Sequence, residues 1–173
     1  MLSTFMMIMM SYYYSVTGIF VMVIYGIYQY IRVHEKITVR EFLKDGIRFI
    51  IPIVVAILMA GVLLLPTAYT ILNGRTDQTT SIQLASLFIP DLNLDGLLYG
   101  TYSLGFTSVI LFALIENLFS EKRENKWLSI AVICVLVFPI LIYLLNGTLY
   151  VRDKILLPFL PLMGILLADF LEK

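Results

Sequence analysis

The sequence predicts an all-α membrane protein: a polytopic bundle of four to five transmembrane helices that forms one domain over residues 1–173. Hydrophobic residues make up 60% of the chain and charged residues 14%, whereas soluble domains carry roughly 25% charged residues. The mean hydropathy is +0.93. The charges are concentrated between long uncharged runs, most of them long enough for the roughly 20 apolar residues that a helix needs to cross a bilayer. The bilayer is therefore the expected solvent of this chain.

The expected helices end near the charges that flank each uncharged run, because a charge at the bilayer centre costs about 2.5 to 3.5 kcal/mol on insertion scales. They cover residues 6–31, 49–72, 97–119, 127–146 and 155–171. Pro66 and Pro139 are expected to kink the second and fourth helices, which neighbouring helices in a bundle can accommodate. The fifth helix is short, and Pro158 and Pro161 disturb its first turns, so a re-entrant or broken helix stays open as an alternative to a full span.

The distribution of Lys and Arg predicts the orientation, because basic connectors remain in the cytoplasm. Nine of these residues lie in the connectors 32–48 and 120–126 or at Lys173, and three lie on the opposite side. The expected topology in the cell membrane has the N-terminus outside and the C-terminus in the cytoplasm. An outer N-terminus without a signal sequence suggests further helices upstream, so the chain is expected to be a fragment of a longer protein.

The first basic connector allows two interpretations. Arg32, Lys36 and Arg40 are spaced at i, i+4 and i+8, which would align them on one face of an interfacial helix that meets lipid phosphates. The simpler interpretation is that these charges only determine the topology. His34 is the single histidine of the chain, and its place in this connector predicts a surface residue.

The outer ends of the expected helices carry the candidate site. Arg75 follows the second helix, Arg152 and Lys154 precede the fifth, and Asp91 and Asp95 lie in the long connector between the second and third helices. Cations at this depth suit a lipid-linked phosphate, whose charge lies at the interface while its tail stays in lipid. The alternative is that the cations snorkel to the interface or pair with neighbouring carboxylates.

Signatures of soluble enzymes are missing from the sequence: it has no GxGxxG, GxxxxGK[ST], CxxC or HExxH. The chain has one histidine and one cysteine, Cys134. The sequence therefore predicts no His-based triad, no zinc site and no intramolecular disulfide. Twelve basic and twelve acidic residues give no net charge that would recruit nucleic acid. The sequence therefore assigns no metal, no cofactor and no catalytic residue.

Three segments resemble, in the same order, parts of the YfhO family of bacterial multi-spanning membrane proteins: YYYSVTGIFVMVIYGIYQYIR, LLPTAYTILNGR and NGTLYVRDKILLPFLPL. The family is similar to GT-C glycosyltransferases, which transfer a sugar from a polyprenyl-phosphate carrier to a cell-envelope polymer. The resemblance implies that the chain is part of a larger GT-C-like membrane domain whose partners are the lipid bilayer, a polyprenyl-phosphate-linked sugar and a cell-envelope acceptor. In such enzymes an acidic residue of the first outer loop acts as base or metal ligand. This chain lacks that loop and alone is expected to be inactive.

The leading hypothesis is therefore a segment of a membrane glycosyltransferase in which Arg75, Arg152 and Lys154 hold the donor phosphate while the chemistry is carried elsewhere. The alternatives are a non-catalytic membrane scaffold and a transporter or flippase subunit. A transporter requires ionisable residues along a pathway within its spans. The long uncharged runs contain none, which counts against it.

Overall fold

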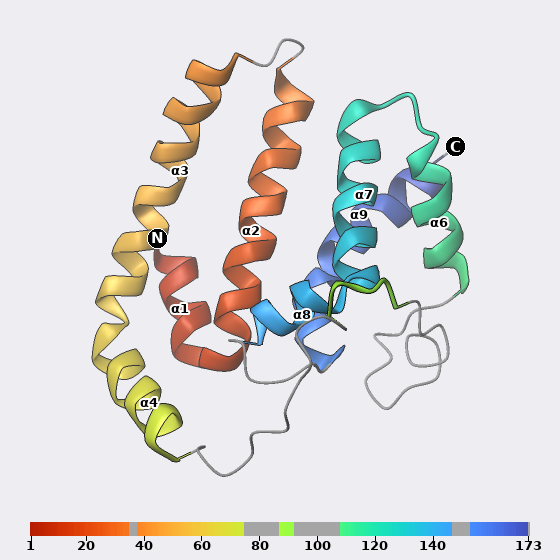
Figure 1. The fold of residues 1–173 in the computed structure, drawn as a ribbon. Coiled ribbons are helices and arrows are strands. Elements are labelled where there is room, and N and C mark those ends of the chain that lie inside the picture. The colour runs from red at the N-terminus through yellow and green to blue at the C-terminus, as the bar shows by residue number, and fades with distance from the viewer. Residues whose placement is uncertain (35–37, 75–86, 92–107, 147–152, 173) are drawn as a thin grey trace.

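The computed structural model describes residues 1–34, 38–74, 87–91, 108–146 and 153–172. Within these residues all regular structure is helical and no strand occurs, which confirms the predicted all-α class (Figure 1). Successive long helices run in alternate directions between two ends of the molecule. The pair α2 (Tyr12–Val33) and α3 (Val39–Met59) and the pair α6 (Ser108–Leu118) and α7 (Arg123–Val137) both have their connectors at one end. We call this end the basic end and the opposite one the distal end.

The first expected helix, 6–31, is divided into two. Helix α1 (Leu2–Met10) stops at Ser11, whose extended backbone (φ −158°, ψ 103°) starts α2 in a new direction. The Ser11 hydroxyl accepts a hydrogen bond from the backbone N–H of Tyr14 at 3.5 Å, as an N-cap residue does. α1 lies at the distal end beside α2 and α3 (Figure 1). Of the first expected helix, α2 alone therefore runs the length of the bundle.

The second expected helix, 49–72, begins earlier and also contains a break. α3 begins at Val39, so much of the expected connector 32–48 is helical. His34 is the C-cap of α2, so Arg32 and Arg40 lie on different helices. The prediction of a single interfacial helix that carries both residues is therefore wrong. A turn at Ala60 separates α3 from α4 (Gly61–Gly74), which contains Pro66. The charges of the first half of α3 do not prevent helix formation, because charged residues have ordinary helix propensities.

The expected effects of proline on the fourth and fifth helices are confirmed. α7 ends at Phe138, and α8 (Pro139–Leu145) continues at an angle of 86°. Phe138 is extended because the residue before a proline is kept out of the helical region. The start of the fifth helix is the 3₁₀ helix η2 (Asp153–Phe159), which contains Pro158, and α9 (Leu160–Leu171) follows. Of the third expected helix, 97–119, residues 97–107 lie outside the described part.

The core lies between α2, α6, α7, η2 and α9. Its largest fully buried side chains include Leu114, Leu128, Phe159 and Leu166. α3 and α4, by contrast, expose large apolar side chains on several faces; Leu58 is 73% exposed and Val62 88% exposed. Isolated apolar residues are common on soluble surfaces, whereas large exposed apolar patches are typical of surfaces that contact a partner or a membrane.

One described helix, Tyr13–Val33, is by itself long and apolar enough to cross a membrane. A second is obtained if the bent pair α7 and α8 is taken as one span. α3 has the length of a span, but it carries Lys44, Asp45 and Arg48 in its first half. The apolar part of the second expected helix is therefore shared between α3 and α4.

Candidate functional site

The structure describes only part of the candidate phosphate site. Arg75, Arg152 and Asp95 lie outside the described residues, and Lys154 is placed only by its backbone, in the first turn of η2. Asp91 is exposed, and its backbone N–H donates to the carbonyl oxygen of Val137 at 2.9 Å. Whether the predicted side chains lie together therefore falls outside the part of the chain that the structure describes.

The described neighbours of these residues do lie toward one end of the molecule. Gly74 ends α4 and Asp153 begins η2, and both of these helix ends face the distal end in Figure 1. Val137, the carbonyl partner of Asp91, ends α7 at the same end. The described chain positions next to Arg75 and Arg152 are thus on the side opposite the basic end.

A second set of polar residues is buried between the helices. Asn117 on α6 is fully buried, and its amide nitrogen donates to the carbonyl oxygens of Ala113 at 2.8 Å and of Leu166 on α9 at 3.1 Å. The Ser129 hydroxyl of α7 donates to the carbonyl oxygen of Leu114 on α6 at 2.5 Å. Such side chains link helices wherever water is excluded, in a soluble core or in a bilayer.

Two tyrosines of α2 extend this pattern along the bundle. The Tyr13 hydroxyl donates to Oδ1 of Asn146 at 2.9 Å near the distal end. The Tyr28 hydroxyl donates to Oδ1 of Asn125 on α7 at 3.3 Å near the basic end. Asn125 and Asn146 are both buried. These contacts fix the register of α2 against α7 and the end of α8.

At the basic end, Lys122 forms an ion pair with Asp169 of α9. The hydrogen bond that the Lys122 ammonium donates to Asp169, together with the charge of the Asp169 carboxylate, raises the pKa of Lys122 above its ordinary value. The Asp169 side chain is mostly buried, while that of Lys122 is about half exposed (12% and 55%). The pair connects the α6–α7 connector to the end of α9, and its role is structural.

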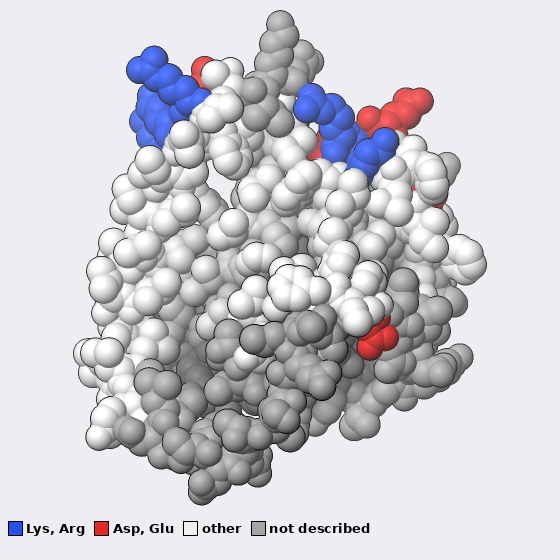
Figure 2. Space-filling view, in the orientation of Figure 1, with Lys and Arg blue, Asp and Glu red and all other residues white. Residues whose placement is uncertain are grey.

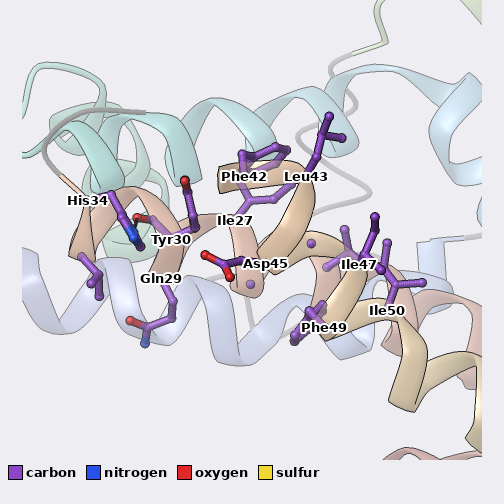
Figure 3. Close-up of a pocket in the computed structure, with 14 residues that line it drawn as sticks. Ile27, Gln29, Tyr30, His34, Phe42, Leu43, Asp45, Ile47, Phe49 and Ile50 are labelled. Carbon is purple, nitrogen blue, oxygen red and sulfur yellow. Dashed lines mark hydrogen bonds between the residues drawn. The ribbon is translucent and has the colours of Figure 1, made fainter. Parts of the chain in front are cut away.

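A groove of about 560 Å³ lies between α2 and α3 close to the basic end (Figure 3). Its walls are almost entirely apolar. The residues that line it are Val23, Gly26, Ile27, Gln29, Tyr30, Val33 and His34 from α2 and its C-cap, and Phe42, Leu43, Asp45, Gly46, Ile47, Phe49 and Ile50 from α3. This volume lies within the range of roughly 300 to 1,000 Å³ that is usual for small-molecule sites.

His34, predicted to be a surface residue, lies at the end of the groove. It caps the C-terminus of α2, is half-buried, and its ring stacks on that of Tyr30 with centroids 4.2 Å apart. Phe42 of α3 meets Tyr30 edge-on at 5.1 Å. The three rings close the groove at the basic end, where Figure 3 shows Tyr30 and His34 side by side.

Sequence reasoning missed the groove, because its apolar residues are ordinary for a membrane helix and only the packing of α2 against α3 shows which of them line a hollow. The buried asparagines gave a usable signal: Asn117 and Asn146 each interrupt or end an otherwise apolar run. In the part of the chain that the structure describes, no three His, Cys, Asp or Glu residues are grouped so that they could hold a metal ion.

Comparisons with known proteins identify no relative: no family model, no curated protein and no solved structure matches the chain.

Proposed function

We propose that the chain is an integral membrane segment with four to five crossings, whose basic end faces the cytoplasm. The distribution of charge carries this proposal. Lys and Arg side chains gather, together with several Asp and Glu side chains, at the end that holds the α2–α3 and α6–α7 connectors, and most of the described residues beneath them are uncharged in the view of Figure 2. Basic residues at one end of an apolar bundle are typical of cytoplasmic connectors.

The alternation of the helices supports the number of crossings. α2, α3, α6, α7 and α9 run in alternate directions between the two ends (Figure 1). Each of the five expected spans contributes one of them. α4, α8 and η2 extend the second, fourth and fifth spans at the distal end, where the bends at Ala60 and Phe138 turn them aside.

The function proposed for this segment is binding of a polyprenyl-phosphate-linked sugar in a GT-C-like glycosyltransferase that modifies a cell-envelope polymer. Arg75, Arg152 and Lys154 hold the donor phosphate. Two observations support this proposal: the resemblance to the YfhO family, and the position of the described chain on either side of these cations at the distal end. Arg is suited to the task because its planar fork can make two hydrogen bonds to one phosphate.

Substitution of Arg152 tests the donor site in the protein as cells produce it. Arg152→Ala removes a charge-assisted hydrogen bond that contributes about 1.5 to 3 kcal/mol, so the affinity for polyprenyl phosphate in detergent micelles falls about tenfold or more. Arg152→Lys recovers only part of the affinity, because a point charge cannot reproduce the fork. Isothermal titration of the purified variants with polyprenyl phosphate measures both effects.

Lys126→Ala is the matched control, since it removes one positive charge from an exposed residue on α7 near the basic end. Its affinity stays at the level of the unmodified protein. If Arg152→Ala binds polyprenyl phosphate normally and loses only thermal stability, Arg152 snorkels to the interface and holds no phosphate. If the unmodified protein does not bind polyprenyl phosphate, the glycosyltransferase proposal is wrong and the scaffold hypothesis takes its place.

A further inference from the structure

The first ten residues hold most of the thioether groups of the chain. Of its eight methionines, five lie there: Met1, Met6, Met7, Met9 and Met10. Helix α1 contacts both α2 and α3, and its buried residues are Thr4 and Ile8, which are 2% and 1% exposed. Met7 is also turned toward the bundle, because its sulfur would lie 2.5 Å from a Cβ atom added to Gly18 of α2. These contacts determine which face of α1 is turned away from the described helices.

The outward face of α1 carries three methionines. Met6, Met9 and Met10 are 49%, 45% and 87% exposed. Met9 and Met10 follow Met6 by three and four residues, so both lie one helical turn beyond it, one on each side. Long side chains of a helix lean back over the preceding turn, toward residues i−3 and i−4. The side chains of Met9 and Met10 are thus directed toward Met6, and the three thioether groups share one small patch of the surface.

This methionine patch (Met6, Met9 and Met10) differs from the other exposed apolar surfaces. Among the described residues of α3 and α4, the large exposed hydrophobic side chains are Val, Leu, Ile, Phe and Tyr, and Met59 is the single methionine. Leu and Met replace one another at little cost where only apolar contact matters. Contact with lipid or with a partner therefore does not explain why three methionines occur together on α1. The property that methionine adds is a polarisable sulfur atom.

Thioether sulfur is a soft ligand, which suits Cu(I). Zn²⁺ favours thiolate, imidazole and carboxylate ligands, and Ca²⁺ and Mg²⁺ favour oxygen. We propose that Met6, Met9 and Met10 bind one Cu(I) ion through their Sδ atoms on the outward face of α1. The flexible side chains let the sulfur atoms adjust to the ion. α1 has no basic side chain that would repel it. The proposal does not depend on the donor site or on the membrane location of the chain.

Titration calorimetry of the purified full chain in detergent tests the site with Ag(I), a soft monovalent ion that is stable in air. All variants carry Cys134→Ala, because a free thiol also binds soft ions. We expect this parent protein to bind one Ag(I). Combined substitution of Met6, Met9 and Met10 by Leu abolishes binding, and circular dichroism checks that the helices are intact. Met9→Leu alone lowers the affinity at least about tenfold, the loss that even an outer-shell change causes at a metal site.

Met7→Leu is the matched control, since Met7 lies on the same helix but its sulfur faces Gly18. Its affinity for Ag(I) equals that of the parent protein, and an excess of Zn²⁺ does not displace Ag(I). The proposal is overturned if the parent protein does not bind Ag(I), if the triple Leu variant binds it equally well, or if Zn²⁺ displaces it. A loss in Met7→Leu as large as in the triple variant would contradict the assignment to the outward face.

Discussion

Single polar side chains connect helices that are far apart in the sequence. Asn117 of α6 reaches the backbone of α9, and Tyr28 of α2 reaches Asn125 of α7. In a medium without water each such bond replaces an unsatisfied group, although measured values in membrane proteins average only about 0.6 kcal/mol. The main effect of these hydrogen bonds is therefore to determine which faces of the helices meet. Their contribution to the overall stability is small.

Lys122 offers a prediction about pH at this scale. Its pairing with Asp169 raises the pKa of Lys122 in the folded state above its ordinary value of 10.5. As the pH rises, Lys122 loses its proton at a lower pH in the unfolded chain than in the folded protein. The contribution of the ion pair to stability is therefore complete below pH 10.5 and disappears as the pH rises through the higher pKa of the folded state. The difference in Tm between the unmodified protein and Lys122→Gln is thus constant from pH 7 to 9 and shrinks above pH 10.5, as thermal unfolding in detergent will show.

Asp169→Asn serves as the control for this prediction. It removes the carboxylate that raises the pKa of Lys122, so a second substitution at Lys122 has little further effect on Tm. A Tm difference for Lys122→Gln that stays the same up to the highest pH at which the protein folds would show that the ion pair is not its source.

At the scale of elements, the helix pair α2 and α3 depends on one small residue. Gly26 leaves room for the Phe49 ring. A Cβ atom added to Gly26 would be in tight contact with some atoms of this ring and in ordinary contact with others. Small residues at such crossings let two helices approach closely, as is common in membrane bundles. The Tyr30 and Phe42 rings form a second contact between α2 and α3, and α1 packs against both helices.

Gly26→Leu is expected to push α3 away from α2 and to lower Tm in detergent. A second substitution, Phe49→Ala, removes the ring that the new side chain meets. We expect the double variant to regain much of the stability that Gly26→Leu loses, a coupling of roughly 0.5 to 3 kcal/mol in a double-mutant cycle. Additive losses in the two single variants would show that Gly26 and Phe49 do not pack against each other.

The elements also show what the sequence could and could not predict. The positions of the charged residues predicted the connectors at the basic end. The positions of the prolines predicted the bend before Pro139 and the irregular start of the fifth helix. The breaks at Ser11 and Ala60 were not predicted, since each depends on a local backbone turn inside a continuous apolar run. The start of α3 at Val39 was missed because charges mark a bilayer boundary without ending a helix.

For the candidate site, the sequence predicts the residues but not how their side chains are arranged. The sequence placed its cations toward one end, but the relation between their side chains depends on packing that hydropathy does not encode. Arg75, Arg152 and Asp95 lie outside the described residues, so their grouping stays a prediction. The groove between α2 and α3 arises from the spacing of two helices and was not visible in the order of their residues.

At the scale of the whole molecule, the two ends of the helical bundle differ in chemistry. The basic end holds the exposed cations of α3 and the Lys122–Asp169 pair, and the distal end holds α4, α8 and η2 (Figures 1 and 2). This division has a functional meaning only if the two ends face different compartments. The proposed donor site would then lie at the outer face of the membrane.

Cysteine labelling of intact cells tests this orientation most directly. In a Cys134→Ala background, one cysteine replaces Gln78, in the connector after α4, and another, in a separate variant, replaces Glu121, which is exposed beside α7 and leaves the Lys122–Asp169 pair in place. We expect a membrane-impermeant maleimide to label the cysteine at position 78 in intact cells. The cysteine at position 121 should be labelled only after the membrane is permeabilised. Labelling of both positions from the same side would contradict the alternating topology, and with it the outer position of Arg152.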